Sequence, residues 1–335
     1  MNSRFVKAVA FCSLTLFVLL FAAGASFAAP RFIIKQAGVG SEFQPTGYAL
    51  REFAEFLRER TNGNVELQLF FNSQLGGDRQ ICEGIQIGTI ELGGVASSVL
   101  ASFVPELTIF DFPYLFKTEE AALRALDGEL GERLAELLLQ RNFLLIGWGT
   151  NGYRHVTNNS GPIFSPDDLR GVKIRTMENP LFIDYFREIG ANPTPMSFSE
   201  LFTALQQGTV DAQENPITII YPSRLYEVQR FISLTGHSYA VVPFVMSARF
   251  FNGLPREYQD IFMEGARLFI ARQRQLTRES DAGFIESMIQ RGIQINELSA
   301  EQIDMFAERA APVYEKYVDI VGRELLELAL RANEI

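Results

Sequence analysis

Two polar side chains that suit anion binding, Arg175 and Asn215, stand near the ends of two predicted strands. The sequence VKIRT predicts a short strand with Arg175 at its carboxyl end, and TVDAQEN predicts another that carries Asn215 to its own carboxyl end. Ligands of open α/β sheets bind at the carboxyl ends of neighbouring parallel strands, so both side chains are expected at one edge. The pair predicts a site that holds a small anion.

Two predicted helices must position these strand ends. Residues 179–190 carry apolar side chains at a period of 3.6, and Gly190 is placed to end that helix. The second helix is expected to begin at Ser197, where Glu200 has the spacing of a capping box, and to end at Gly208. Strand and helix therefore alternate through this stretch.

Earlier segments repeat the alternation, with strands expected over 31–39, 65–71 and 89–96, the last ending near Ser97, and helices over 45–61, 76–88 and 123–139. This order predicts a parallel sheet with right-handed crossovers. A helical pattern over 256–291 would span ~50 Å at ~1.5 Å per residue, so we expect it to bridge separate parts of the fold.

The N-terminus has the pattern of an export signal. Arg4 and Lys7 precede an apolar run over residues 8–23, and Ser26 and Ala28 place small residues for cleavage before residue 29. A single transmembrane helix is the alternative, but the run is shorter than the ~20 residues that a bilayer requires. We therefore expect a signal peptide over residues 1–28 and a periplasmic mature chain.

Composition excludes several classes of function. Removal of residues 1–28 leaves 28 basic residues against 40 acidic ones, a balance that disfavours nucleic acid as a partner. Only Cys82 then remains, so an internal disulfide is excluded, and the isolated His155 and His237 predict no metal site and no cofactor. The remaining residues exceed what one hydrophobic core usually supports, so we expect two lobes.

Gly147, Gly149 and Gly152 match G-x-G-x-x-G after a predicted strand. A dinucleotide site also requires a helix to open at the third glycine, whereas the strand-like YRHVTNN follows. We expect these glycines to mark the point where the chain leaves the first lobe.

Several long motifs carry a family resemblance: GYRHVTN, SPDDLRGVKIRT, GANPTPMSFSELFTALQQGTVDAQENP, YEVQRFISLTGH and QLGGDRQICEGIQIGTIELGG. Together they resemble the DctP-like substrate-binding proteins of tripartite ATP-independent periplasmic (TRAP) transporters, over nearly the whole mature chain. One departure is Ala212, which stands where the family usually has glycine.

The resemblance implies an α/β periplasmic binding protein fold with two lobes, crossing hinge strands and a long helix that spans both lobes. The implied first lobe comprises residues 29–152 and 242–280, and the second comprises 153–241 and 281–335. One ligand would lie in the cleft between them.

The resemblance also implies site residues. Arg175 would be the principal carboxylate clamp, because a guanidinium matches a carboxylate with two parallel N–H donors. Arg154 would be a second donor, with a lobe-stabilising ion pair as its alternative, Asn215 would fix orientation, and the Phe198 ring would lie along the ligand. The remaining candidates are Ser97, Glu42, Tyr239, Asn151 and Asn179, while His237 is interpreted as structural.

The implied function is capture of an organic acid and its delivery to the small and large membrane subunits of a TRAP transporter, by a monomeric binding protein. A sugar acid such as a uronate is favoured; a C4-dicarboxylate held by both arginines, a 2-oxo acid in a smaller cleft, and a sensor that signals through a membrane kinase remain alternatives. An enzyme is disfavoured because G-x-S-x-G is absent, although two carboxylates suited to glycoside hydrolysis occur in any acidic chain.

Overall fold

The computed structural model describes residues 30–334, so the expected signal peptide over residues 1–28 lies outside the described part. The described chain has the predicted α/β fold, and its main run of strands has the order β2-β1-β3-β9-β4-β7-β5-β6. The expectation of a parallel sheet holds only within each half of the fold, because the crossing strands β4 and β9 pair antiparallel with each other and with their neighbours. The strands are β1 (Phe32–Ala37), β2 (Val65–Phe70), β3 (Leu92–Gly94), β4 (Phe143–Asn158), β5 (Lys173–Thr176), β6 (Asn192–Pro195), β7 (Ala212–Pro216), β8 (Phe231–Leu234), β9 (Tyr239–Ser247) and β10 (Gln294–Glu297).

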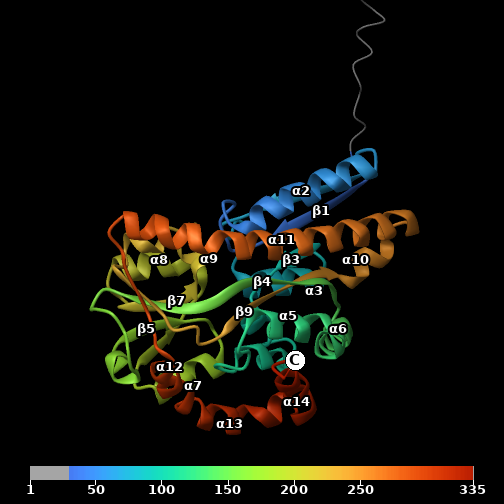
Figure 1. The fold of residues 1–335 in the computed structure, drawn as a ribbon. Coiled ribbons are helices and arrows are strands. Elements are labelled where there is room, and N and C mark those ends of the chain that lie inside the picture. The colour runs from blue at the N-terminus through green and yellow to red at the C-terminus, as the bar shows by residue number, and fades with distance from the viewer. Residues whose placement is uncertain (1–29, 335) are drawn as a thin grey trace, which may run out of the picture.

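Helices cover both faces of these strands (Figure 1). The α-helices are α2 (Pro45–Arg60), α3 (Asp78–Ile87), α4 (Ser97–Leu100), α5 (Glu119–Asp127), α6 (Glu129–Gln140), α7 (Pro180–Glu188), α8 (Phe198–Gln206), α9 (Ile217–Ile220), α10 (Ala248–Gly253), α11 (Arg256–Gln290), α12 (Ala300–Glu308), α13 (Ala311–Val321) and α14 (Arg323–Arg331). Short 3-10 helices are η1 (Pro105–Asp111), η2 (Pro166–Leu169) and η3 (Leu225–Glu227).

The strand β4 is shared by two halves of the fold. It pairs with β9 from Phe143 to Tyr153, and with β7 and β8 beyond that point. We call β1, β2 and β3, which reach β4 through β9, the first half-sheet, and β5 to β8 with β10 the second half-sheet. Figure 1 shows β4 and β9 side by side between the halves, as the predicted crossing strands require.

Gly147, Gly149 and Gly152 lie inside β4. An added Cβ at Gly147 would lie 2.4 Å from Ile270 in α11, and one at Gly149 would lie 2.5 Å from the Phe244 ring in β9. Gly152 has a φ of +85° beside a register shift between β4 and β9, a conformation that glycine adopts without strain. Close packing and a bulge thus account for all three glycines.

The helix α11 covers 35 residues and confirms the expected bridging helix. It packs against α2 and β4 beside the first half-sheet, and against α9 and β10 beside the second. Figure 1 shows α11 running across the molecule beneath α2.

Two predicted elements were wrong in detail. The single helix expected over 123–139 is two helices, α5 and α6, because Gly128 between them is extended. The third strand ends at Gly94, so Ser97 begins the helix α4 instead of ending a strand.

The capping box expected at Ser197 does not form. The Ser197 hydroxyl lies 3.1 Å from that of Ser199, and α8 begins without a side-chain cap. Ser197 instead faces Gly77 at the start of α3, where an ideal Cβ would lie 2.8 Å from the Ser197 Oγ and 4.0 Å from its Cβ. The two half-sheets therefore approach each other closely at this point.

The C-terminal helices lie along the side opposite α11 (Figure 1). A capping box begins α12: Ser299 donates its backbone N–H to Gln302 Oε1 at 2.8 Å, and its hydroxyl oxygen accepts the Gln302 N–H at 3.3 Å. The helix α13 packs against η1 and α7, while α14 packs against α5 and α6. These helices thus contact elements on both sides of the crossing strands, and the lobe boundaries stay a prediction.

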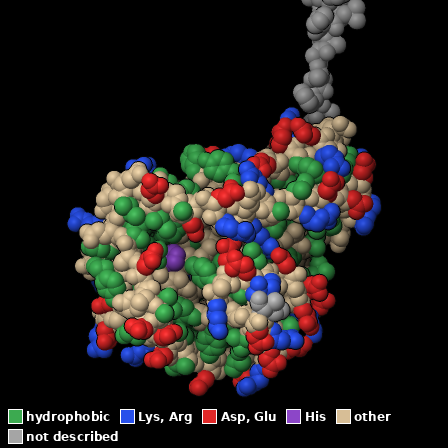
Figure 2. All heavy atoms as spheres, in the orientation of Figure 1, with side chains coloured by type: hydrophobic (Ala, Val, Ile, Leu, Met, Phe, Trp, Pro, Cys, Tyr) green, Lys and Arg blue, Asp and Glu red, His purple; other side chains and the backbone are tan. Residues whose placement is uncertain are grey.

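Three apolar clusters fill the interior of the part of the chain that the structure describes. One packs α2 and α11 on the first half-sheet around Phe53 and Phe269, and another surrounds Leu201 and Met288 near α8. The largest extends from Ile81 to the C-terminal helices. Over residues 30–334, no helix has both the length and the apolar character that a membrane span requires. Figure 2 shows acidic and basic side chains interspersed over the visible face.

Candidate functional site

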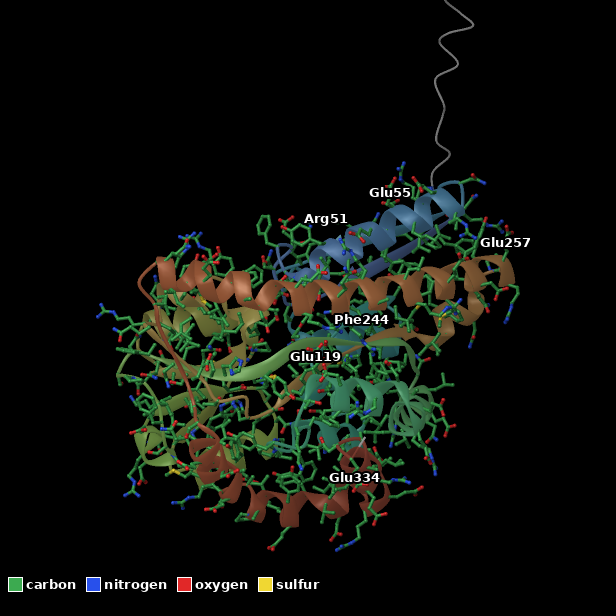
Figure 3. The ribbon with its side chains drawn as sticks, viewed as in Figure 1. Arg51, Glu55, Glu119, Phe244, Glu257 and Glu334 are labelled. Carbon is green, nitrogen blue, oxygen red and sulfur yellow. The ribbon has the colours of Figure 1, made fainter. Side chains whose placement is uncertain are left out.

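A cavity of about 380 Å³ lies between the two half-sheets. The segment from β1 to the start of α2 and the start of α3 line one side, while the ends of β5 and β7 and the start of α8 line the other. Phe244 of β9, labelled in Figure 3, forms part of the wall, and its ring packs 4.7 Å from that of Phe269 in α11. A ligand in this cavity would contact both half-sheets.

Arg175 leaves β5 with its side chain in the cavity wall and only 2% exposed. Its Nε and Nη2 both donate to the carbonyl oxygen of Met196, at 3.0 and 2.8 Å. Its Nη1 is buried and has no hydrogen-bond partner among the described residues. Burial lowers the pKa of Arg175 to about 10, so the group stays a cation at neutral pH. The backbone thus fixes one edge of the guanidinium and leaves Nη1 for an anion.

Arg154 lines the same cavity but is engaged by protein groups. Its Nε bonds to the Glu214 carboxylate, and its Nη2 donates to Glu214 Oε1 at 2.8 Å and Asn215 Oδ1 at 3.2 Å. Burial alone would raise the pKa of Glu214, but Arg154 and His237 reverse the shift and hold it at about 2. Arg154 therefore forms the ion pair that was the alternative to a ligand contact, while still reaching the cavity wall.

The His237 ring forms a further hydrogen bond to Glu214, the acid of this ion pair. Its Nε2 lies 3.2 Å from Glu214 Oε2, and its Nδ1 lies 2.8 Å from the Thr235 hydroxyl. Burial lowers the pKa of His237, so the ring is neutral and donates to Glu214. This arrangement agrees with the structural role expected for His237.

Five of the nine residues expected at the site lie together in the cavity wall: Arg175, Arg154, Asn215, Phe198 and Asn151. The Phe198 ring centroid lies 6.0 Å from the Arg175 guanidinium carbon, close enough for a cation–π contact. Asn215 donates to Gln213 Oε1 at 2.5 Å, which fixes its amide beside Arg154. The β5–β7 pairing that brings Arg175 and Asn215 together is parallel, as predicted.

The other four, Ser97, Glu42, Tyr239 and Asn179, are not among the residues that line the cavity. Glu42 is turned to an ion pair with Arg51, 2.6 Å away. Ser97 is buried at the start of α4, and Tyr239 is buried against the ring of Tyr153.

Asn179 has a structural task. Its Oδ1 accepts the N–H groups of Leu181 and Phe182, which caps α7, while its Nδ2 donates to Ser98 O at 3.0 Å and to Asp111 Oδ2 at 2.9 Å. Burial raises the pKa of Asp111 to about 7. All the hydrogen-bonding capacity of the Asn179 amide is thus used within the protein.

Sequence reasoning missed several polar residues of the wall, among them Gln36, Gln44 and Asp78. Gln36 lies near the end of β1, and Gln44 precedes α2. Asp78 opens α3 and accepts the Ala96 N–H at 3.4 Å, and its pKa is raised to about 6 by burial. The available signal was a glutamine near the carboxyl end of the first strand, the placement that identified Arg175.

Within residues 30–334, no group of His, Cys, Asp and Glu side chains is arranged to hold a metal ion. Cys82 is buried and free, and burial raises the pKa of its thiol. The chemistry of the cavity is therefore carried by guanidinium, carboxylate, amide and aromatic groups.

A known protein family and several known proteins match most of this chain. A family model described as "Bacterial extracellular solute-binding protein, family 7" (DctP) matches residues 37–319. The 2,3-diketo-L-gulonate-binding periplasmic protein YiaO of Escherichia coli is 35% identical over 280 residues, which are 82% of this chain and 85% of that protein.

Solved structures of similar proteins share this fold. The sugar acid binding protein DctPAm from Advenella mimigardefordensis, in complex with galactonate, is 33% identical with a TM-score of 0.88, covering 91% of this chain and 98% of that one. A TRAP periplasmic solute-binding protein from Shewanella oneidensis with bound succinate is 29% identical, also with a TM-score of 0.88, covering 91% and 100%. This chain therefore belongs to the bacterial extracellular solute-binding proteins of family 7, the DctP family.

Proposed function

We propose that this protein captures a sugar acid in the periplasm and delivers it to the small and large membrane subunits of a TRAP transporter. The observation that carries the proposal is Nη1 of Arg175, a buried nitrogen of a cation that lines the cavity and lacks a partner in the described chain. A carboxylate supplies the charge and the acceptor that this nitrogen requires. Membership of a family of binding proteins supports capture over catalysis.

The charge balance of the cavity supports one carboxylate on the ligand. Arg154 is already neutralised by Glu214, and Arg79 at the rim lies 3.3 Å from Glu83. Arg175 is then the guanidinium of the wall without an ion-pair partner among residues 30–334. A dicarboxylate would bring a second negative charge without a second free cation.

The relatives that are named for 2,3-diketo-L-gulonate and solved with galactonate support a sugar acid. The Shewanella oneidensis neighbour with succinate makes a C4-dicarboxylate the second candidate. A cavity of about 380 Å³ exceeds what a small 2-oxo acid would fill.

Hinge closure is the proposed mechanism. We assign residues 29–152 and 242–280 to the first lobe, and 153–241 and 281–335 to the second. A ligand held by Arg175 on one side and by first-lobe groups on the other stabilises the closed form through contacts that exist only there. Closure also excludes water, which strengthens the pairing of the carboxylate with Arg175.

A thermal-shift screen of the mature protein against galactonate, glucuronate, succinate and pyruvate tests the proposal, followed by titration calorimetry. We expect a sugar acid to give the largest shift and the tightest binding. Tighter binding of succinate would establish the second candidate, and no shift with any carboxylate would refute the assignment of Arg175 as the clamp.

A further inference from the structure

Two glutamines on the first-lobe side of the cavity have buried polar atoms without partners in the described chain. Gln36 is 1% exposed, and its Nε2 donates to the Ala37 carbonyl at 3.0 Å. A carbonyl accepts hydrogen bonds only, so this bond fixes the amide and leaves Gln36 Oε1 as an unsatisfied acceptor.

Gln44 supplies an unsatisfied donor. Its side chain is 5% exposed, and its Nε2 has no partner within residues 30–334. The Gln44 amide lies against Gly40, where an ideal Cβ would be only 2.1 Å from Oε1. The glycine thus permits the position of the Gln44 side chain in the wall.

A buried acceptor and a buried donor together determine which ligand groups can satisfy both glutamines. Hydroxyl groups both donate to an acceptor such as Gln36 Oε1 and accept from a donor such as Gln44 Nε2. An ionised carboxylate can only accept, so it would leave Gln36 unsatisfied, which is costly in a buried site.

The charges of the wall also favour hydroxyl groups over a second carboxylate on the ligand. Asp78 lines the cavity at the start of α3, and Glu178 and Glu200 line it as exposed residues. These three carboxylates repel a second carboxylate on the ligand and accept hydrogen bonds from hydroxyl groups.

We propose that Gln36 and Gln44 form a hydroxyl-binding subsite that makes the cavity select hydroxylated monocarboxylates over dicarboxylates and over unsubstituted fatty acids of the same length. The inference rests on the proposed function, because it takes Arg175 as the partner of the single carboxylate. It assigns specificity to the first lobe and charge recognition to the second.

Three six-carbon acids serve as probes: galactonate, adipate and hexanoate. They share length and differ in hydroxyl groups and in the second carboxylate. We expect the wild-type protein to bind galactonate at least about 100-fold more tightly than the other two, since a site built for a hydroxyl strongly rejects an analogue that lacks it. Equal or tighter binding of adipate would overturn the inference.

Gln36→Met and Gln44→Met remove the polar atoms and keep the side-chain length. Each is expected to weaken galactonate binding about 10- to 100-fold, the effect of losing one hydrogen bond to a buried group, while hexanoate binding changes by less than about threefold, a small fraction of that loss. Gln140→Met, at an exposed position at the end of α6 and outside the cavity wall, is the control and should leave the galactonate affinity unchanged.

Melting temperatures without ligand separate a folding defect from a specificity defect. If Gln36→Met does not fold, Gln44→Met and the wild-type probe series still decide the question. Equal weakening of galactonate and hexanoate, or no weakening of either, in folded variants would overturn the subsite.

The same titrations include Arg175→Ala, so that the two proposals can fail separately. Loss of galactonate binding in Arg175→Ala with unchanged affinity in both glutamine variants would refute the subsite and leave the clamp standing. Retained binding in Arg175→Ala would refute the clamp itself.

Discussion

Arg154 and Arg175 are two buried arginines in one cavity wall, and each guanidinium lies over a phenylalanine ring. They differ in whether a protein carboxylate neutralises their charge. Glu214 and Asn215 take two nitrogens of Arg154, whereas Arg175 is held by a neutral carbonyl and keeps Nη1 unpaired within residues 30–334. A buried cation with a protein counter-charge serves the fold, while one without it is left for a ligand.

The largest effect is expected from removal of the Arg175 guanidinium. We expect Arg175→Ala to weaken sugar-acid binding by about 3–5 kcal/mol, because the bound carboxylate loses its charged partner. That is a loss of about two to four decades in affinity. Arg175→Lys should recover only part of it, because lysine lacks the planar fork.

Titration calorimetry measures this effect, with Arg170→Ala as the control. Arg170 is an exposed arginine paired with Asp167 at 3.2 Å, on the same side of the fold but outside the cavity wall. If Arg175→Ala binds the sugar acid with near-wild-type affinity, Arg175 is not the arginine that binds the ligand carboxylate.

Glu214→Gln should act on stability instead. The variant leaves Arg154 buried without its counter-charge, and we expect a loss of about 3 kcal/mol, because removing one partner of a buried pair costs about 3–5 kcal/mol and glutamine still accepts hydrogen bonds. Urea unfolding without ligand measures the change. An unchanged midpoint would show that Arg154 does not depend on Glu214.

The same pair gives a pH dependence with a defined sign. The pKa of Glu214 is lowered from 4.5 to about 2 in the folded protein. Its contribution to stability is therefore fully present above pH 4.5 and is lost as the pH falls toward 2. The difference in unfolding free energy between the wild type and Glu214→Gln should narrow from pH 6 to pH 3; a constant difference would argue against the lowered pKa.

The smallest effect concerns the ring over Arg175. Phe198→Leu keeps an apolar side chain but removes the cation–π contact, so we expect affinity to fall about 2- to 5-fold, corresponding to about 0.5–1 kcal/mol. Calorimetry with galactonate at two salt concentrations would measure it. A loss as large as that of Arg175→Ala would mean that the ring, and not the charge, dominates recognition.

The sequence predicted the second-lobe side of the site better than the first. Arg175 and Asn215 could be identified because each lies near the carboxyl end of a short strand whose partner strand is close in the sequence, and the structure pairs those strands in parallel. Family motifs around them also supported the long helix and the crossing strands, which the structure contains.

The first-lobe side was predicted less well. Gln36 lies near the carboxyl end of a strand, as Arg175 does, but only the folded chain shows that it is buried and that Ala37 fixes its amide. Asn179 lies next to the site in sequence, yet its side chain turns to cap α7 and to meet Asp111. Proximity along the chain does not give the direction of a side chain.

The close approach of Gly77 and Ser197 has a practical consequence. An ideal Cβ at Gly77 lies 4.0 Å from the Ser197 Cβ, within the range of about 3.5–4.5 Å that a disulfide spans. Cys82, the free thiol within the described residues, is buried and would compete little. The double variant Gly77→Cys, Ser197→Cys would place a reversible covalent bond between α3 and the start of α8, on the two sides of the cavity, so that oxidation would hold the two sides together around a bound ligand and reduction would release it.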